Sequence, residues 1–492
     1  MMKKKIFVII ILVLLCAALG AVYYLLTHED TGEVDPGTQI KLLPGEVLES
    51  NSTLLMFEHL ERAAISRLEV YNAYGSYAFA YDSATGDFCL EGNPGAPYDQ
   101  YSFSSLIVDA GYAIASRRVT DHCEDFSVYG LDEASIQGKY TITTHAGMTH
   151  TVYIGSQVPG SSMYYCRYEG RDAVYVSNSN YNSTLLASLP TLISPILAYP
   201  MNTTDYYAVE DFYLKKNGET VVAVDYLEED ERDSSNYIYR MTEPAAYIVN
   251  DTNYSSVLQK LCTPYGIATL EIARDKSGIS QEILAKYGLD AEHYVYELHY
   301  VYNKMENHMI FSAQNPDGSY YCYSFLFDLV ALCKGDTFSF LDWSLIDYTS
   351  KVTLNLNIND VASITVDGLG VSETFSLYGT GEELQVLAQN AQLTFDADGV
   401  KNFRQFYKTM LVVYMEGYAE KTDTSDLILT VTIVKRDGEE LVYQYYGYTT
   451  RRCFYTVNGQ GEFYVLRDAV EKIASDAQKV LRGEAVDSWA KN

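Results

Sequence analysis

The sequence predicts an α+β protein, in which one N-terminal transmembrane helix is followed by about three tandem repeats of antiparallel sheet plus helix. Three observations predict this arrangement. An apolar run without a charged residue occupies residues 6–26. Apolar alternation typical of strands returns at offsets of 144 residues (Ile65 to Val209) and 152 residues (Val209 to Val361). Segments with the 3- and 4-residue spacing of amphipathic helices lie between the alternating stretches.

The N-terminal segment fits a membrane anchor. Its 21 apolar residues would form a helix of about 31 Å, which is long enough to cross the hydrocarbon core. Lys3–Lys5 precede the run, whereas Glu29 and Asp30 follow it. The positive-inside rule then places a basic tip, residues 1–5, in the cytoplasm. The bulk of the chain is expected outside, as a single-pass protein of the cell membrane.

Two alternatives compete with an uncleaved anchor. A cleaved signal peptide would use the small residues of Ala18-Leu19-Gly20, but the apolar run continues to Leu26, which is long for a secretory segment. A lipoprotein would use Cys16, but Leu15 stands where a small residue is wanted. The sequence favours the uncleaved anchor and leaves cleavage as the alternative.

Charge and composition narrow the class of protein. The formal net charge is −30, with 65 acidic and 35 basic residues. Such a chain is repelled by phosphate backbones and by anionic lipid, so we expect no nucleic-acid partner and no membrane contact besides the anchor. The hydrophobic content of 48% and the 46 tyrosines favour packed, β-rich domains.

The cysteines match no known disulfide or metal-binding pattern. Beyond the anchor they are odd in number and form no C-x-x-C pair, so neither a structural zinc site nor a thioredoxin-type site is supported. They are Cys89, Cys123, Cys166, Cys262, Cys322, Cys333 and Cys453. Most are expected to be buried thiols, with one or two disulfides as the alternative in an oxidising compartment.

Each repeat opens with apolar alternation that predicts a strand. The corresponding positions are Ile65, Leu68 and Val70, then Val209, Phe212 and Leu214, then Val361, Ile364 and Val366. A second strand-like run follows, such as Tyr77–Tyr81. Each opening therefore predicts a β-hairpin or a meander.

A helical segment follows each opening. The predicted apolar stripes are Phe103, Leu106, Ile107, Ala110 and Ile114 in the first repeat, and Val400, Phe403, Phe406, Met410 and Val413 in the third. Asp396 and Asp398 provide an N-terminal signal for the third helix. In the second repeat, the stripe that starts at Val257 is cut short by Pro264.

A local motif and a set of hairpins come next. Tyr129-Gly130-Leu131-Asp132 recurs as Tyr287-Gly288-Leu289-Asp290, and the third repeat has lost it. Strand pairs follow in all three repeats. The clearest is in the third, where two alternating runs flank Asp437-Gly438, a strong hairpin signal.

An aromatic pair then precedes another strand. Tyr164-Tyr165-Cys166 matches Tyr320-Tyr321-Cys322, and Tyr164–Val176 aligns without gaps on Cys453–Val465. Aromatic side chains bind sugars and partner proteins, so Tyr164, Tyr165, Tyr320 and Tyr321 are the candidate partner-binding residues. The alternative is packing, because neighbouring residues of a strand point to opposite faces.

These patterns divide the chain into seven parts. They are a basic tip (1–5), an anchor (6–26), a linker (27–61), three lobes (62–200, 205–350 and 359–485) and a C-terminal tail (486–492).

The motifs of the first lobe resemble domain of unknown function 4340. The resemblance rests on Tyr129-Gly130-Leu131-Asp132, the hairpin ending Ile154-Gly155, Tyr164-Tyr165-Cys166-Arg167 and Val174-Tyr175-Val176. Ala134 departs from the family pattern, where proline is common. Residues 62–200 carry the resemblance best, and residues 205–350 carry it more loosely. It implies a bacterial envelope protein with one N-terminal helix, often encoded beside ABC-type export permeases, and it supplies no catalytic residues.

Other motifs have simpler explanations than chemistry. His145 and His150 flank a predicted hairpin turn and are treated as turn residues rather than as a metal pair. The run Glu228–Glu231 fits a solvated loop better than a pair of glycosidase carboxylates. Ser488 and Lys491 form an S-x-x-K match at the chain end, where a preorganised nucleophile is not expected.

We therefore expect a non-catalytic, membrane-anchored extracytoplasmic interaction module without a cofactor, accessory to an ABC-type transporter or another envelope complex. The alternatives are a cell-surface hydrolase acting on wall glycan or peptide, and a glycan-binding surface module. The sequence predicts no catalytic or metal-ligating set.

Overall fold

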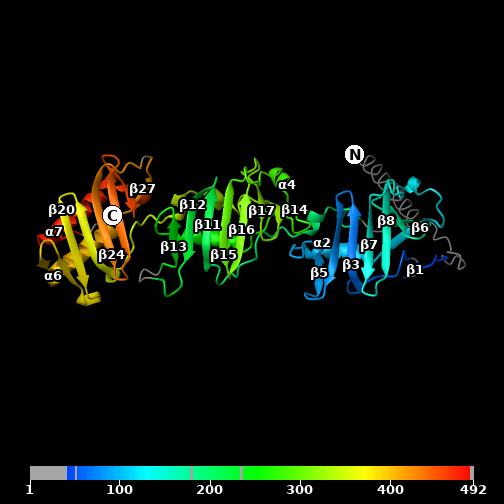
Figure 1. Ribbon diagram of the computed structural model, residues 1–492, viewed down its shortest axis with the longest axis horizontal. Helices are drawn as coiled ribbons and strands as arrows, with labels where there is room; N and C mark the ends of the chain where they lie inside the picture. Colours follow the sequence, from blue (N-terminus) through cyan, green and yellow to red (C-terminus); the bar gives the residue numbers. More distant parts are fainter. Residues whose placement is uncertain (1–40, 50–52, 178–180, 233–236, 421, 488–492) are drawn as a thin grey trace, which may run out of the picture. The chain divides into compact units, whose positions relative to one another are not determined.

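The computed structural model describes residues 41–49, 53–177, 181–232, 237–420 and 422–487 (Figure 1). The predicted anchor, residues 6–26, lies outside the described residues. Within them, no helix is both long enough and apolar enough to cross a membrane. The chain divides into two compact units, one of Met1–Ile65 with Val108–Tyr181 and the other of Ser66–Ile107 with Asn182–Asn492.

The first unit is built around antiparallel strands in the order β1-β2-β6-β10-β9-β8-β7. The strands are β1 (Val47–Leu48), β2 (Leu54–Leu55), β6 (Ile114–Thr120), β7 (Gly138–Thr144), β8 (Thr149–Gln157), β9 (Tyr164–Tyr168) and β10 (Val174–Ser177). The 3-10 helix η2 (Phe126–Tyr129) precedes β7. β1 and β2 lie in the segment predicted as a linker, and β2 pairs with β6 at Leu55 and Ile114.

The second unit contains a short meander and two complete sheets. The meander comprises β3 (Ile65–Asn72), β4 (Gly75–Asp82) and β5 (Asp87–Leu90), followed by helix α2 (Gln100–Gly111).

The second sheet has the order β13-β12-β11-β15-β16-β17-β18-β14, and Figure 1 shows β11, β15, β16 and β17 side by side. Its strands are β11 (Val209–Lys216), β12 (Glu219–Tyr226), β13 (Tyr239–Glu243), β14 (Ala268–Ile272), β15 (Tyr296–Tyr302), β16 (Met305–Phe311), β17 (Tyr320–Ser324) and β18 (Leu329–Cys333). Its helices are α3 (Asp251–Leu261), α4 (Gln281–Ala285), η5 (Ser339–Asp342) and α5 (Leu345–Tyr348).

The third sheet has the order β22-β21-β20-β19-β24-β25-β26-β27-β23. Its strands are β19 (Val361–Gly368), β20 (Val371–Tyr378), β21 (Gln385–Ala388), β22 (Leu393–Thr394), β23 (Met415–Tyr418), β24 (Leu427–Lys435), β25 (Glu440–Gly447), β26 (Arg452–Val457) and β27 (Gln460–Leu466). Helices α6 (Ala397–Leu411) and α7 (Arg467–Leu481) complete it.

One strand order recurs along the chain. Apart from β22, the third sheet repeats the order of the second, strand for strand. The order β5-β4-β3 in one unit and β7-β8-β9-β10-β6 in the other reproduce the same two segments of that pattern. The predicted strand openings are also confirmed, since Ile65, Val209 and Val361 are all fully buried. The predicted sheet repeats are thus present as a repeated strand order. The alternating apolar positions bury one face of each sheet.

The predicted helices need correction at their ends. α2 ends at Gly111, so Ile114, predicted as its last apolar position, instead begins β6. At this end of the helix, the backbone of Gly111 passes close to the backbone of Leu60. A side chain at position 111 would lie only 2.4 Å from the Leu60 carbonyl oxygen. Val413 likewise follows the end of α6. The N-terminal signal of α6 is confirmed, because the Asp396 side chain accepts a hydrogen bond from the Gly399 amide at 2.8 Å.

Candidate functional site

The four tyrosines predicted to bind a partner lie in β9 and β17, in equivalent places. Tyr164 and Tyr320 are buried, with 3% and 0% of their surface exposed. Tyr165 and Tyr321 are half-buried. Tyr165 packs edge-on against Tyr129 with ring centroids 5.0 Å apart, and Tyr321 packs against Tyr287 at 5.2 Å. The aromatic pair and the Tyr-Gly-Leu-Asp motif therefore meet in both copies, which is a packing role.

The hydroxyl of Tyr320 reaches a carboxylate. Tyr320 donates a hydrogen bond to Asp342 Oδ2 at 2.6 Å, and Tyr296 donates to Oδ1. Lys216 Nζ lies 3.3 Å from Oδ1. Asp342 ends η5, whereas Lys216 ends β11 and Tyr296 begins β15. Side chains from the three strands β11, β15 and β17 thus converge on one acidic side chain, whose exposed fraction is 46%.

The charge state of this cluster follows from its hydrogen bonds. Burial favours the neutral acid, but the bonds from Tyr296, Tyr320 and Lys216 outweigh it and hold the pKa of Asp342 below its usual value. Burial, followed by the bond to Asp342, raises the pKa of both tyrosines. Asp342 is therefore an ionised acceptor with a fixed orientation. It is not a proton donor for general acid catalysis, which needs a raised pKa.

A groove lies beside this carboxylate. One hollow of about 430 Å³ contains Tyr320 and Asp342, and a second of about 620 Å³ shares Ile267, Lys334 and Asp336 with it. We call this continuous surface the Asp342 groove; it is formed by residues from segments 259–267, 314–320 and 334–342. Both hollows fall within the usual range for small-ligand sites, roughly 300–1,000 Å³.

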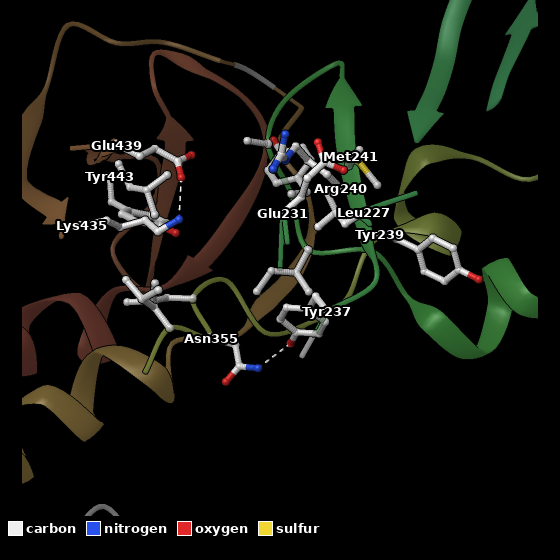
Figure 2. Close-up of a pocket in the computed structure, with 16 residues that line it drawn as sticks. Leu227, Glu231, Tyr237, Tyr239, Arg240, Met241, Asn355, Lys435, Glu439 and Tyr443 are labelled. Atoms are coloured by element: carbon white, nitrogen blue, oxygen red, sulfur yellow. Dashed lines mark hydrogen bonds and ion pairs between the residues drawn. The ribbon is translucent and has the colours of Figure 1, made fainter. Parts of the chain in front are cut away.

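A second concave surface is smaller. The cleft in Figure 2 has a volume of about 170 Å³ and is formed by residues from segments 227–231, 237–248, 354–356 and 435–443. Two of its charged residues are already paired, because Lys435 Nζ lies 2.7 Å from a Glu439 carboxylate oxygen. Asn355 donates to the Tyr237 hydroxyl at 2.7 Å across its floor. These contacts describe a junction between segments better than a binding site.

Within the described residues, the other motifs singled out in the sequence lie in packed or solvent-exposed places. His150 stacks on Phe57 with ring centroids 4.5 Å apart, and its Nδ1 lies 3.2 Å from the Tyr168 hydroxyl. Burial lowers the pKa of His150. Glu228–Glu231 follow β12 as an exposed loop. The seven described cysteines are free thiols, and the described residues contain no cluster of three or more His, Cys, Asp or Glu side chains suited to a metal. Ser488 and Lys491 lie outside the described residues.

A row of stacked side-chain rings on the second sheet was not predicted from the sequence. Tyr213 stacks on His299 with centroids 4.8 Å apart, and His308 stacks on Phe325 at 4.2 Å. The two histidines face each other across β15 and β16, with centroids 6.1 Å apart. Glu297 accepts from Tyr213 at 3.0 Å and lies 3.2 Å from His308 Nε2.

The repeat offsets could have revealed this row. The same amide-to-carbonyl bond links Phe325 to His308, Glu169 to Thr151 and Asn458 to Val442, so these pairs are equivalent. The offsets and the strand registers define the equivalent positions in the other copies. In the first copy, the positions of Tyr213, His299, His308 and Phe325 are occupied, in that order, by Glu69, Thr141, Thr151 and Glu169. In the third copy, they are occupied by Thr365, Thr432, Val442 and Asn458. Rings therefore occupy these positions in the second copy alone.

Comparison with known proteins identifies the family of one segment. A family model described as domain of unknown function (DUF4340) matches residues 90–263. Residues 90–263 belong to the DUF4340 family. This confirms the resemblance seen in the sequence, and the DUF4340 segment runs from the end of β5 to just beyond α3. It thus takes in parts of two predicted lobes. No curated protein and no solved structure matches the chain.

Proposed function

We propose that this chain is a non-catalytic interaction module, anchored in the cell membrane by residues 6–26 and accessory to an ABC-type transporter or another envelope complex. The observation that supports it is the repeated strand order, in which the motifs common to the copies serve packing. Tyr129, Tyr165, Tyr287 and Tyr321 hold the same contact in both copies. Partners bind protein surfaces through a few anchoring side chains, and a packed scaffold can present such side chains.

The hydrolase alternative needs two carboxyl groups with different environments facing one cleft. Burial raises the pKa of Asp225, and Asp211 adds to the rise; burial also raises the pKa of Asp251. Neither side chain lines the Asp342 groove or the cleft of Figure 2. Asp317 and Asp342, which do line the groove, both have lowered pKa values. The electrostatics therefore favour binding over hydrolysis.

Placement in the membrane is tested by labelling single introduced cysteines with a membrane-impermeant maleimide. Tyr74 is 61% exposed, so a Tyr74→Cys variant should be labelled on intact cells. A Lys4→Cys variant should be labelled only after lysis, and the unsubstituted chain sets the background from its own cysteines. Labelling of both variants only after lysis would contradict an extracytoplasmic module.

A further inference from the structure

We propose that the Asp342 groove binds an oligosaccharide. This site goes beyond the transporter-associated role, and neither proposal depends on the other. A sugar chain needs three things from a protein surface: an apolar patch for its C–H faces, fixed hydrogen-bonding groups of both kinds for its hydroxyls, and an open, elongated shape. The groove provides all three within the second sheet.

The apolar patch is formed by Tyr265 and Ile267. They are 43% and 51% exposed, and both line the groove. Both side chains line the same hollow. A flat ring with a polar tip suits the mixed surface of a sugar.

The backbone that carries this patch is fixed by hydrogen bonds to two neighbouring segments. The Gly266 amide donates to the Pro195 carbonyl at 2.8 Å, and the Ile267 amide donates to the Leu332 carbonyl at 2.6 Å. A side chain at position 266 would lie 2.8 Å from the Leu332 oxygen, so only glycine fits this approach. The two apolar side chains therefore stand on a fixed backbone, which lowers the entropy lost when a ligand binds.

The polar groups are held in place as well. Asp342 is ionised and oriented by two tyrosine hydroxyls, and its oxygens keep lone pairs for further hydrogen bonds. Lys260 Nζ donates to the Asp336 carbonyl at 3.0 Å and to Ser339 Oγ at 2.6 Å, which leaves one of its three N–H groups for a ligand. An acceptor and a donor thus stand at fixed positions, as hydroxyl groups of a sugar require.

The charges of the groove favour a ligand bound by hydrogen bonds. Lys260 and Lys334 line it together with Asp317, Asp336 and Asp342. This mixture of signs gives a polyanion no net attraction, and the chain as a whole repels one. A hydroxyl-rich, largely uncharged chain matches the mixture.

The same strand position is used differently elsewhere in the chain. Tyr164, the equivalent of Tyr320, stacks on the buried Tyr181 with centroids 6.4 Å apart. In the third copy, the gapless alignment places the buried Cys453 there. In the second copy, the tyrosine at this position holds the exposed carboxylate of Asp342.

The test is a titration of the full chain in mild detergent with defined oligosaccharides, followed by calorimetry. The probes are hexamers of β-1,4-linked N-acetylglucosamine, β-1,4-linked glucose and α-1,4-linked glucose. Binding of at least one probe is expected. Tyr265→Ala and Asp342→Asn should each weaken it by roughly tenfold or more, as for an anchoring side chain.

The matched control is Tyr378→Ala, which removes a ring of similar exposure (54%) on the third sheet and should leave binding unchanged within about twofold. Thermal melts of each variant verify folding. A chain that binds none of the three probes overturns the proposal, and so does binding that survives both groove substitutions. Selective binding of short uncharged peptides in the same titration, with the same dependence on Tyr265, would assign the groove to peptide instead.

Discussion

The strands β7–β10 of the first unit and β15–β18 of the second follow the same order but present different side chains. The Tyr129–Tyr165 contact of the first recurs as Tyr287–Tyr321 in the second, with similar ring separations. Thr141 and Thr151, by contrast, share a hydrogen bond of 3.0 Å where the second copy has a pair of histidines. Positions that stay the same therefore belong to the scaffold, and positions that change mark where one copy has acquired a surface of its own.

The largest effect is expected where the copies agree. Leu131 and Leu289 follow the glycine of the shared motif, and both are fully buried. Leu131→Ala and Leu289→Ala should each destabilise the protein by about 3 kcal/mol, because each leaves a cavity in a packed core. Chemical denaturation measures both. Costs that differ by more than about 2 kcal/mol would break the equivalence of the two copies.

The glycines of the shared motif have the same backbone conformation in both copies but different surroundings. Gly130 and Gly288 have φ angles of 65° and 64°, a conformation that costs other residues about 1 kcal/mol. A Cβ on Gly130 would also lie 2.2 Å from Ser156 Oγ, whereas the nearest atom to a Cβ on Gly288 is Ser312 Cβ at 3.9 Å. Gly130→Ala should therefore lower the melting temperature more than Gly288→Ala. Equal shifts would show that the first turn relaxes freely.

The third prediction concerns a single hydroxyl. Tyr320→Phe removes a hydrogen bond to the half-exposed Asp342 and should cost about 1 kcal/mol of unfolding free energy. The matched control is Tyr321→Phe, which keeps the ring contact with Tyr287 and should change stability by less than about 0.5 kcal/mol. If the two substitutions cost the same, Asp342 is not held by Tyr320 as described.

The smallest effect is a dependence on pH. Burial lowers the pKa of His308 from its usual 6.5, against the opposing effect of Glu297, and His299 lowers it further. The unfolded chain then binds more protons than the folded one just below pH 6.5, so stability should fall as the pH drops from about 7 to about 5. His308→Thr, which introduces the first copy's residue, should remove part of this loss, by less than about 1 kcal/mol. Denaturation curves at pH 7 and pH 5 give the comparison. An unchanged difference between the two pH values would show that His308 does not contribute.

The sequence was most informative where period and turn chemistry agree. Alternation through Val209, Phe212 and Leu214 predicted a strand with one covered face, and Asp437-Gly438 predicted a hairpin; both are present. Helix ends were less predictable, because α2 stops where its backbone meets Leu60, a contact that involves a distant part of the chain. Local spacing carries no information about such an approach.

The site was harder to predict than the fold. Tyr320 was identified as a candidate, but Asp342 and Lys216, which complete its cluster, lie 22 and 104 residues away in sequence and belong to no motif. Tyr265 and Ile267 belong to none of the motifs that the sequence offers. Only the fold shows that their side chains remain exposed beside a carboxylate. The ring row was accessible from the repeat offsets, once positions that differ between copies are compared as closely as those that agree.

The most direct test of the interaction module is affinity capture of the full chain from native membranes in mild detergent, with quantification of the proteins that accompany it. We expect recovery of permease or ATPase subunits, or of another envelope component, in near-stoichiometric amount. We also expect that they are lost when residues 3–26 are replaced by a cleavable signal. A chain that is recovered alone in its anchored form, and that releases soluble fragments from wall glycan or peptide, would contradict the account.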